Sequence, residues 1–277
     1  MHDDELEIDD ELVRTLIAEQ FPDWAGLPLV RAGDGTVNVV YRLGTELSVR
    51  LPRRAPREDV EDRVLAAVSA LPLDVPRVVA LGKPTDAYPW EWAVHTWLDG
   101  VHPDGDLPVE DVAALVAALH RLDPTGAPEP GYGRRRPLAE RDDAVRDALT
   151  RIDAPGAVDL WDESLRAPGW HRSGVWVHAD LDRRNVVERG GRLAGVLDWA
   201  GAGVGDPALD VMVAWKLVAR DDRERFRALL DVDDATWLRA KGWCVSQALI
   251  ALGYYTPANN PAIHAEATRW LAEVLHG

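Results

Sequence analysis

The chain is short of cysteine and of long apolar runs, and each shortage excludes a class of protein. Its single cysteine, Cys244, cannot form an internal disulfide, so disulfides do not hold the fold. No run of about 18 apolar residues occurs, which argues against a membrane-spanning helix. The acidic start, MHDDELEIDDE, lacks the apolar core of a signal peptide. We therefore expect a cytoplasmic protein in which Cys244 is a buried, packed thiol.

Lysine is also scarce, because only Lys83, Lys216 and Lys241 occur among the 31 basic residues. The formal net charge is -16. An acidic chain repels the phosphates of nucleic acid, so we expect no nucleic-acid partner. The lack of a long apolar run leads us to expect no membrane partner. The same charge is compatible with a cationic small-molecule substrate, although acidic residues also serve simply to keep a surface soluble. No long exposed apolar helix is evident, and a monomer is expected.

The 277 residues are enough for one large domain or two lobes, and the pattern changes near Asp99 and Gly100. Before this point the spacing predicts helix, hairpin, helix, hairpin; after it, the pattern is mainly helical. Asp9 or Asp10 is the expected N-cap of the first helix. The elements expected in the first lobe are helices at 8–21 and 57–70 and strands at 37–43, 47–51, 74–82 and 90–100. Helices are expected in the second lobe at 108–122, 141–152, 157–167 and from 208 onward.

The most informative stretch is VWVHADLDRRNVV, residues 175–187, which sets polar residues between two Val-rich strands. His178, Asp180 and Asn185 fit H-x-D-x-x-x-x-N, the spacing of a kinase catalytic loop. In that chemistry Asp180 accepts the proton of an attacking hydroxyl, and Asn185 offers its amide oxygen to Mg²⁺. A further carboxylate, Asp198, ends the next strand. We expect a hairpin of NVVERG with RLAGVLDW to bring Asp198 beside Asn185.

In these residues the chain resembles the aminoglycoside phosphotransferase family, kinase-like enzymes that include macrolide kinases. The specific matches are VHADLDRRNVV, GVLDW and GDPALDV, and weaker ones are GTVNVVYRLG, VRLPRR and YPWEWAVHTWLDG. The resemblance implies an α+β, bilobal, protein-kinase-like fold with an antiparallel sheet in the small N-terminal lobe and a larger, mainly helical C-terminal lobe. Residues 1–99 would be the nucleotide-binding lobe with the hinge, and residues 100–277 the catalytic and substrate-binding lobe.

The resemblance also implies a role for each matching residue. Asp180 would be the catalytic base, and Asn185 and Asp198 the Mg²⁺ ligands. His178 would brace the loop, while Asp206 would be the buried carboxylate that caps a helix and ties down the catalytic loop. The implied nucleotide contacts are Gly33, Gly35, Thr36 and Asn38 in a loop over the phosphates and His95, Thr96, Trp97 and Leu98 in the hinge. Gly33-x-Gly35 taken alone is equally compatible with an ordinary hairpin turn.

Two positions depart from the family pattern. Ala179 stands where the family has glycine, and we expect it to be tolerated if its backbone φ is negative. Arg50 stands where kinases carry the phosphate-binding lysine, with Glu61, or alternatively Glu58, as its expected partner. Because of Arg50, the alternative of a kinase-shaped binding protein without useful turnover also stays open.

The expected function is NTP-dependent O-phosphotransfer, with ATP or GTP and Mg²⁺ as cofactors. The acceptor would be an aminoglycoside-type antibiotic, or alternatively a macrolide or a metabolic alcohol. Candidate substrate contacts are Asp182, Asp159, Asp162 and Glu163, for each of which a solvated surface position is the alternative. Zinc enzymes and serine hydrolases are disfavoured, since neither H-E-x-x-H nor G-x-S-x-G occurs.

Overall fold

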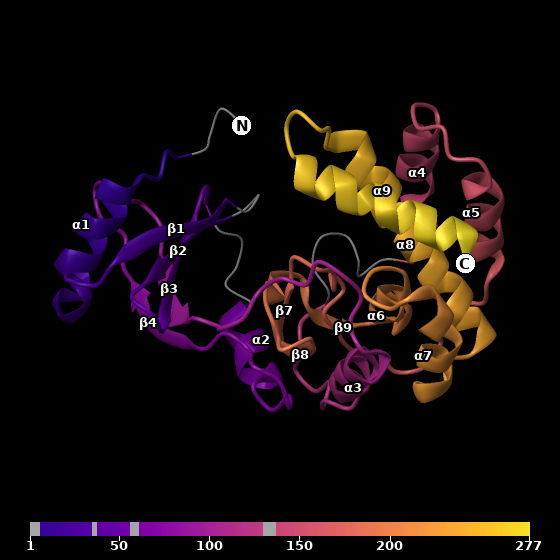
Figure 1. Ribbon diagram of the computed structural model, residues 1–277, viewed down its shortest axis with the longest axis horizontal. Coiled ribbons are helices and arrows are strands. Elements are labelled where there is room, and N and C mark those ends of the chain that lie inside the picture. Colours follow the sequence, from indigo (N-terminus) through magenta and orange to yellow (C-terminus); the bar gives the residue numbers. More distant parts are fainter. Residues whose placement is uncertain (1–5, 35–37, 56–60, 130–136) are drawn as a thin grey trace. The chain divides into compact units, whose positions relative to one another are not determined.

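The computed structural model describes residues 6–34, 38–55, 61–129 and 137–277 and is drawn in Figure 1. The chain divides into two compact units. The first comprises residues 1–69 and 74–99, and the second residues 70–73 and 100–277. Residues 70–73, expected in the first lobe, therefore belong to the second unit. A sheet-based first unit and a mainly helical second unit confirm the expected α+β class.

The first unit is built on a five-stranded antiparallel sheet with the order β1-β2-β3-β5-β4. Its strands are β1 (Leu29–Asp34), β2 (Asn38–Leu43), β3 (Leu47–Pro52), β4 (Val78–Gly82) and β5 (Trp92–Thr96). Its helices are α1 (Asp10–Gln20) and α2 (Glu61–Val68), with a 3-10 turn at Pro22–Trp24. Asp9 caps α1 by accepting the Leu12 N–H at 2.8 Å, which confirms one of the two expected caps.

The core of the first unit follows from strand alternation. Alternate residues of β2, Val39, Tyr41 and Leu43, are buried, as period-two patterning predicts. They belong to one apolar cluster with Leu16 and Ile17 of α1. Side chains buried on one face of the sheet thus fix the register that places Arg50 and His95 on neighbouring strands.

The second unit is mainly helical. Its helices are α3 (Val109–His120), α4 (Asp142–Leu149), α5 (Ala157–Arg166), α6 (Ala208–Val211), α7 (Arg223–Leu229), α8 (Asp234–Tyr254) and α9 (Pro261–His276). Its 3-10 turns are Leu138–Arg141, Trp199–Gly201, Met212–Trp215 and Arg220–Asp222. Its short strands are β6 (Val175–Val177), β7 (Val186–Arg189), β8 (Arg192–Val196) and β9 (Gly203–Gly205). β6 pairs with β9, and β7 pairs with β8 in the expected hairpin.

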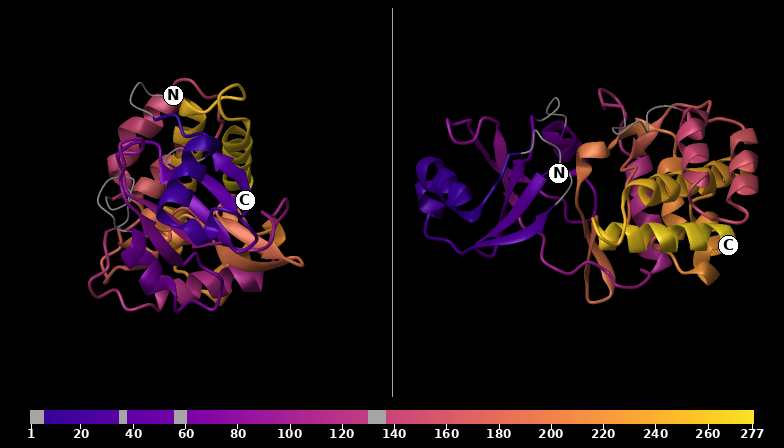
Figure 2. Two further views of the ribbon diagram at one scale, coloured as in Figure 1. Left: turned by 90° about the vertical axis from the view of Figure 1, so that its left-hand side faces the viewer. Right: turned by 90° about the horizontal axis from the view of Figure 1, so that it is seen from above.

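Helix α8 is the centre of this unit, since it packs against α4, α5, α6 and α9 (Figures 1 and 2). Its middle turns are buried without interruption from Gly242 to Leu249. Cys244 lies in this stretch, and burial raises the pKa of its thiol to about 11. The expectation of a packed, unreactive cysteine is confirmed.

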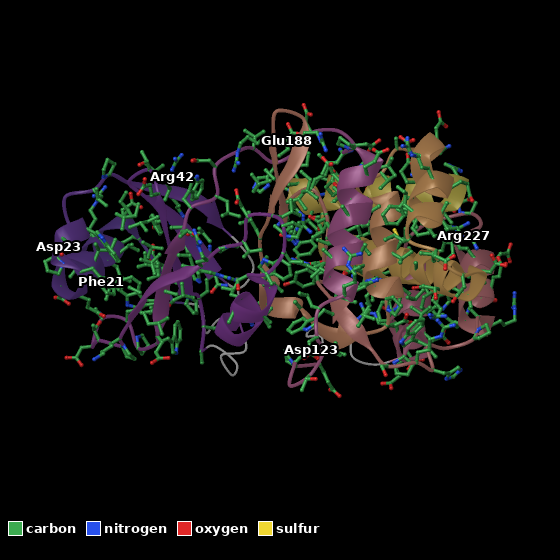
Figure 3. All side chains as sticks on the ribbon, turned by 90° about the horizontal axis from the view of Figure 1, so that it is seen from below. Phe21, Asp23, Arg42, Asp123, Glu188 and Arg227 are labelled. Atoms are coloured by element: carbon green, nitrogen blue, oxygen red, sulfur yellow. The ribbon has the colours of Figure 1, made fainter. Side chains whose placement is uncertain are left out.

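The β7–β8 hairpin is tied to the start of the second unit. Val101 and Glu188 exchange two backbone hydrogen bonds, at 3.1 and 2.8 Å, and Glu188 is labelled in Figure 3. Gly100 precedes this contact with a φ of +134°, and a Cβ there would meet the Glu188 carbonyl oxygen at 2.4 Å. Only glycine fits this position.

Among the described residues, no helix is both long and apolar enough to cross a bilayer.

Candidate active site

The candidate catalytic loop runs from His178 to Asn185, between β6 and β7. His178 is fully buried, and its Nε2 lies 2.8 Å from the Leu197 carbonyl oxygen. Its Nδ1 accepts the Asp180 N–H at 3.2 Å, so the proton of the neutral ring belongs on Nε2. The ring also makes an edge contact with Trp199, at 4.7 Å between centroids. His178 therefore links the loop to the segment around Asp198, as a bracing residue would.

The turn at Ala179 is held by a buried carboxylate. Ala179 has a φ of +67°, in the left-handed region, so the condition on which alanine was expected to be tolerated is not met. Asp210 of α6, with no exposed surface, accepts the His178 N–H at 3.0 Å and the Ala179 N–H at 2.8 Å. Two charge-assisted hydrogen bonds from one carboxylate stabilise this strained backbone.

Asp206 has only part of the role expected of it, because Asp210 is the residue that holds the loop. Asp206 is half-buried and accepts the N–H of Ala208, the first residue of α6, at 3.0 Å, so its carboxylate lies at the start of the helix as expected, although Pro207 is the N-cap. Its carboxylate forms an ion pair with Arg239, at 2.7 Å, rather than with the loop. Both residues belong to GDPALD, and the sequence offers no local signal that separates them.

Asp182 is buried and paired. Its side chain has no exposed surface and accepts the Arg184 backbone N–H at 2.8 Å. It also forms an ion pair with the Arg184 guanidinium at 2.5 Å. A carboxylate so enclosed braces the loop and is not accessible to a substrate. The expectation that Asp182 contacts substrate is therefore not supported. This pair holds Arg184, which the sequence did not single out, and the charge of Asp180 acts on the same guanidinium.

Asn185 and the residue before Asp198 meet through the backbone, since the Leu197 N–H donates to the Asn185 carbonyl oxygen at 2.8 Å. The Asn185 amide donates through Nδ2 to the Asp180 carbonyl oxygen at 2.8 Å, which turns its oxygen to the opposite side. Asp198 is exposed at the end of the hairpin with a φ of +57°. One amide oxygen and one carboxylate form a donor set that fits Mg²⁺, which prefers oxygen ligands.

In the first unit, Arg50 and His95 lie on neighbouring strands, β3 and β5. The Asn38 amide finds partners when its oxygen faces the Arg50 guanidinium, with Nε and Nη2 each 2.9 Å away. Burial and the nearby Arg50 charge lower the pKa of His95 to about 4. Arg50 thus shares its surroundings with Asn38 and a neutral imidazole.

Part of the expected nucleotide site lies outside the described residues. Gly35, Thr36 and Glu58 belong to the segments 35–37 and 56–60, and the Glu61 side chain is likewise outside the description. Gly33 is in β1, opposite Val40 of β2.

The expected hinge is described, and two of its N–H groups are already engaged. Thr96 N–H donates to the Arg77 carbonyl at 2.9 Å, and Trp97 N–H donates to the Glu46 carbonyl at 2.7 Å. These two backbone N–H groups are therefore used within the first unit itself. His95 and Leu98 are the other two hinge positions named from the sequence, and His95 lies in β5.

The remaining substrate candidates lie on α5. Asp159 and Glu163 are exposed, whereas Asp162 pairs with Arg146 of α4 at 2.6 Å. None of the three has a described contact with the catalytic loop.

Helix α9 reaches the catalytic loop instead. Its Glu266 pairs with Arg269 at 2.7 Å and lies 3.8 Å from Arg183 of the loop. Burial alone would raise the pKa of Glu266, but the bonds and charges of Arg269 and Arg183 outweigh it and lower the pKa. The Arg184 guanidinium lies 5.8 Å from the centroid of the Trp270 ring on the same helix. The carboxylate of Glu266, which lies next to the catalytic loop, is thus already neutralised by arginine.

The family comparison matches residues 28–243 to the APH model, described as the phosphotransferase enzyme family. Among curated proteins, the uncharacterized protein YcbJ of Bacillus subtilis (strain 168) is 26% identical over 209 residues. That match covers 66% of this chain and 67% of the relative. The span matched by the family model, residues 28–243, includes the catalytic loop, the β7–β8 hairpin and most of the first unit.

Solved structures of similar fold cover nearly the whole chain. The GDP and kanamycin complex of APH(2")-IIia matches with a TM-score of 0.67 and 18% identity, over 95% of this chain and 98% of that one. Macrolide 2'-phosphotransferase type I matches with a TM-score of 0.66 and 20% identity, over 96% and 98%. At these identities the likeness establishes the kinase-like fold. Since the family model spans more than half of the sequence, the chain belongs to the phosphotransferase enzyme family and is a small-molecule kinase.

Proposed function

We propose that this protein transfers the γ-phosphate of ATP or GTP to a hydroxyl group of a small molecule. The observation that carries the proposal is the braced loop that presents Asp180 between His178 and Asn185. Phosphoryl transfer requires mainly that the reacting groups be positioned and their charge neutralised. The backbone N–H and the carbonyl of Asp180 are both hydrogen-bonded within the loop, which holds this residue in position.

Asp180 is the proposed base. Its carboxylate would accept the proton of the acceptor hydroxyl and orient the oxygen for in-line attack. Asn185 and Asp198 would hold Mg²⁺, which neutralises charge on the phosphate oxygens when bound. The oxygen-only donor set of these two residues supports this assignment.

Arg50 is the proposed phosphate-binding cation in place of lysine. Guanidinium is always charged and offers two N–H groups to phosphate oxygens, which supports the replacement. Glu61 remains its proposed partner, and Gly33, Gly35, Thr36 and Asn38 remain the proposed phosphate loop. Thr96, Trp97 and Leu98 remain the proposed hinge, with Leu98 favoured for a backbone N–H contact to the base. GDP in a similar structure supports a purine nucleotide here.

An aminoglycoside-type antibiotic is the first candidate acceptor, and the protein would act as a cytoplasmic monomer. The net charge of -16 favours a polycation, and kanamycin is bound by one structurally similar protein. Asp159 and Glu163, both exposed on α5, remain candidate contacts for the amino groups.

A macrolide-type or other weakly charged alcohol is the second candidate, and one observation favours it. The carboxylates of Asp182, Asp162 and Glu266 are each paired with arginine. A polycation would have to displace these partners or use other acidic residues. The fold shared with a macrolide phosphotransferase agrees with this alternative.

The test is nucleotide turnover with Mg²⁺, run with ATP and GTP against kanamycin, a macrolide panel and simple amino alcohols. Stimulation by one class names the acceptor. Asp180→Asn should lower turnover by about 10²- to 10⁴-fold while nucleotide binding is retained. The matched control is Asp153→Asn, at an exposed position. Undiminished turnover in Asp180→Asn contradicts the proposal, and nucleotide binding without any turnover would point to a binding protein.

A further inference from the structure

The peptide that joins Ala179 to Asp180 is gripped from its carbonyl side by a residue distant in sequence. The Ala179 carbonyl oxygen accepts a hydrogen bond from Nε2 of Gln247 at 3.1 Å. Gln247 lies in the buried middle of α8 and is only 8% exposed. This carbonyl belongs to the peptide that immediately precedes the proposed base, so its orientation sets the direction in which Asp180 leaves the loop.

The Gln247 amide is held in one orientation by a buried cation. Its Oε1 accepts a hydrogen bond from the Lys216 Nζ at 2.6 Å. An ammonium group only donates, so the amide oxygen must face Lys216 and the amide nitrogen must face Ala179. Without such a partner the two ends of an amide are nearly interchangeable.

Lys216 is an unusual residue to find there. It has no exposed surface, and its Nζ lies 4.1 Å from the centroid of the Trp270 ring. Burying a lysine charge is costly, and the Gln247 oxygen and the aromatic face compensate it. Nothing in the chemistry of Asp180, Asn185 or Asp198 employs this cation directly.

The Ala179 residue is therefore fixed from both sides. Asp210 receives its N–H, and the pair of Gln247 and Lys216 engages its carbonyl. Its left-handed φ of +67° is disfavoured for alanine, so such a backbone persists only when its surroundings impose it. A small misplacement of a catalytic group is enough to cost a large part of the rate.

We propose that Lys216 and Gln247 are positioning residues for Asp180, acting through the hydrogen-bonded chain Lys216–Gln247–Ala179. The inference rests on the proposed role of Asp180 as base. It assigns to the scarce lysine at 216 a part in catalysis without contact with substrate or nucleotide.

The test is the substitution Gln247→Glu. Glutamate has the same shape and keeps the contact with Lys216, but its carboxylate has no N–H for the Ala179 carbonyl. We expect kcat for Mg²⁺–nucleotide turnover to fall at least tenfold, with the nucleotide KM within twofold of wild type and the urea midpoint retained. Water serves as acceptor where no compound of the panel stimulates turnover. Ser246→Ala is the matched control, since Ser246 is a buried neighbour on α8 that bonds to Arg141.

Lys216→Met provides the second variant, because it removes the group that orients the amide while Gln247 stays in place. It should lower kcat in the same selective way, and it decides the matter if Gln247→Glu does not fold. Placed on Asp180→Asn, neither substitution should lower the residual turnover further, as a general loss of folded protein would. Wild-type kcat in the folded variants overturns the inference, whereas wild-type turnover in Asp180→Asn overturns the proposed function instead.

Discussion

The carboxylate of Asp210 accepts the backbone N–H of Ala179 at 2.8 Å, and both residues are fully buried in the second unit. The same carboxylate accepts the His178 N–H at 3.0 Å. The residue before the proposed base is thus fixed by an acid 31 positions further along the chain. The precision of the loop depends on contacts that its own sequence does not contain.

Ala179→Gly should stabilise the protein. An L-residue in the left-handed region is strained, and glycine removes that strain at a smaller entropic cost. We expect the free energy of unfolding to rise by about 1 kcal/mol, measured by urea denaturation. Ala117→Gly in α3 is the matched control and should lower it by about 1 kcal/mol. A loss of stability at Ala179 as large as that at Ala117 would contradict the strained turn.

Asp210→Asn should impair both stability and turnover. Replacing one carboxylate oxygen by an NH₂ group sets a donor against a backbone N–H, at a cost of about 2 kcal/mol. Asp206→Asn weakens the pair with Arg239 but leaves both N–H bonds of the loop in place, so kcat should change little. Urea denaturation and kcat measured on the two variants distinguish the two acids. A larger loss of kcat in Asp206→Asn would restore the role first expected for it.

His95 should make the protein less stable as the pH falls. Burial and Arg50 lower its pKa to about 4, below the value of about 6.5 in an unfolded chain. The unfolded state therefore binds the proton first, so the stability present above about pH 6.5 is lost progressively toward about pH 4. The loss attributable to His95 is at most about 3 kcal/mol.

His95→Gln removes this titrating group, so its urea midpoint should fall less between pH 7 and pH 5 than that of the wild type. His276→Gln, at an exposed position, is the control and should follow the wild-type curve. Parallel curves for all three proteins would show that His95 is not the source of the pH dependence.

Asp198→Asn should raise the Mg²⁺ concentration required for half-maximal turnover by about tenfold or more, because a charged oxygen ligand is replaced by a neutral one. The measurement is a Mg²⁺ titration of nucleotide turnover at fixed nucleotide concentration. Asp221→Asn, at an exposed position on the 3-10 turn before α7, should leave the requirement unchanged. An unchanged requirement in Asp198→Asn would remove Asp198 from the metal site.

Features that depend only on neighbouring residues were predictable from the sequence. The spacing of His178, Asp180 and Asn185 falls within one loop, and the β7–β8 hairpin follows from two short apolar runs on either side of Gly190 and Gly191. Strand alternation and helix caps are likewise local, which is why the α+β class was predictable. These features need no knowledge of what lies across the fold.

The residues that hold the catalytic loop from a distance became evident only in the folded structure. Asp210 and Gln247 each bond to Ala179, and Lys216 bonds to Gln247, over separations of 31 to 68 positions. No periodic pattern in the sequence predicts these contacts. The left-handed backbone conformation of Ala179 was likewise not predictable, because alanine disfavours a positive φ. Burial accounts for both results, because a buried donor, acceptor or charge must find its partner wherever the packed helices bring one.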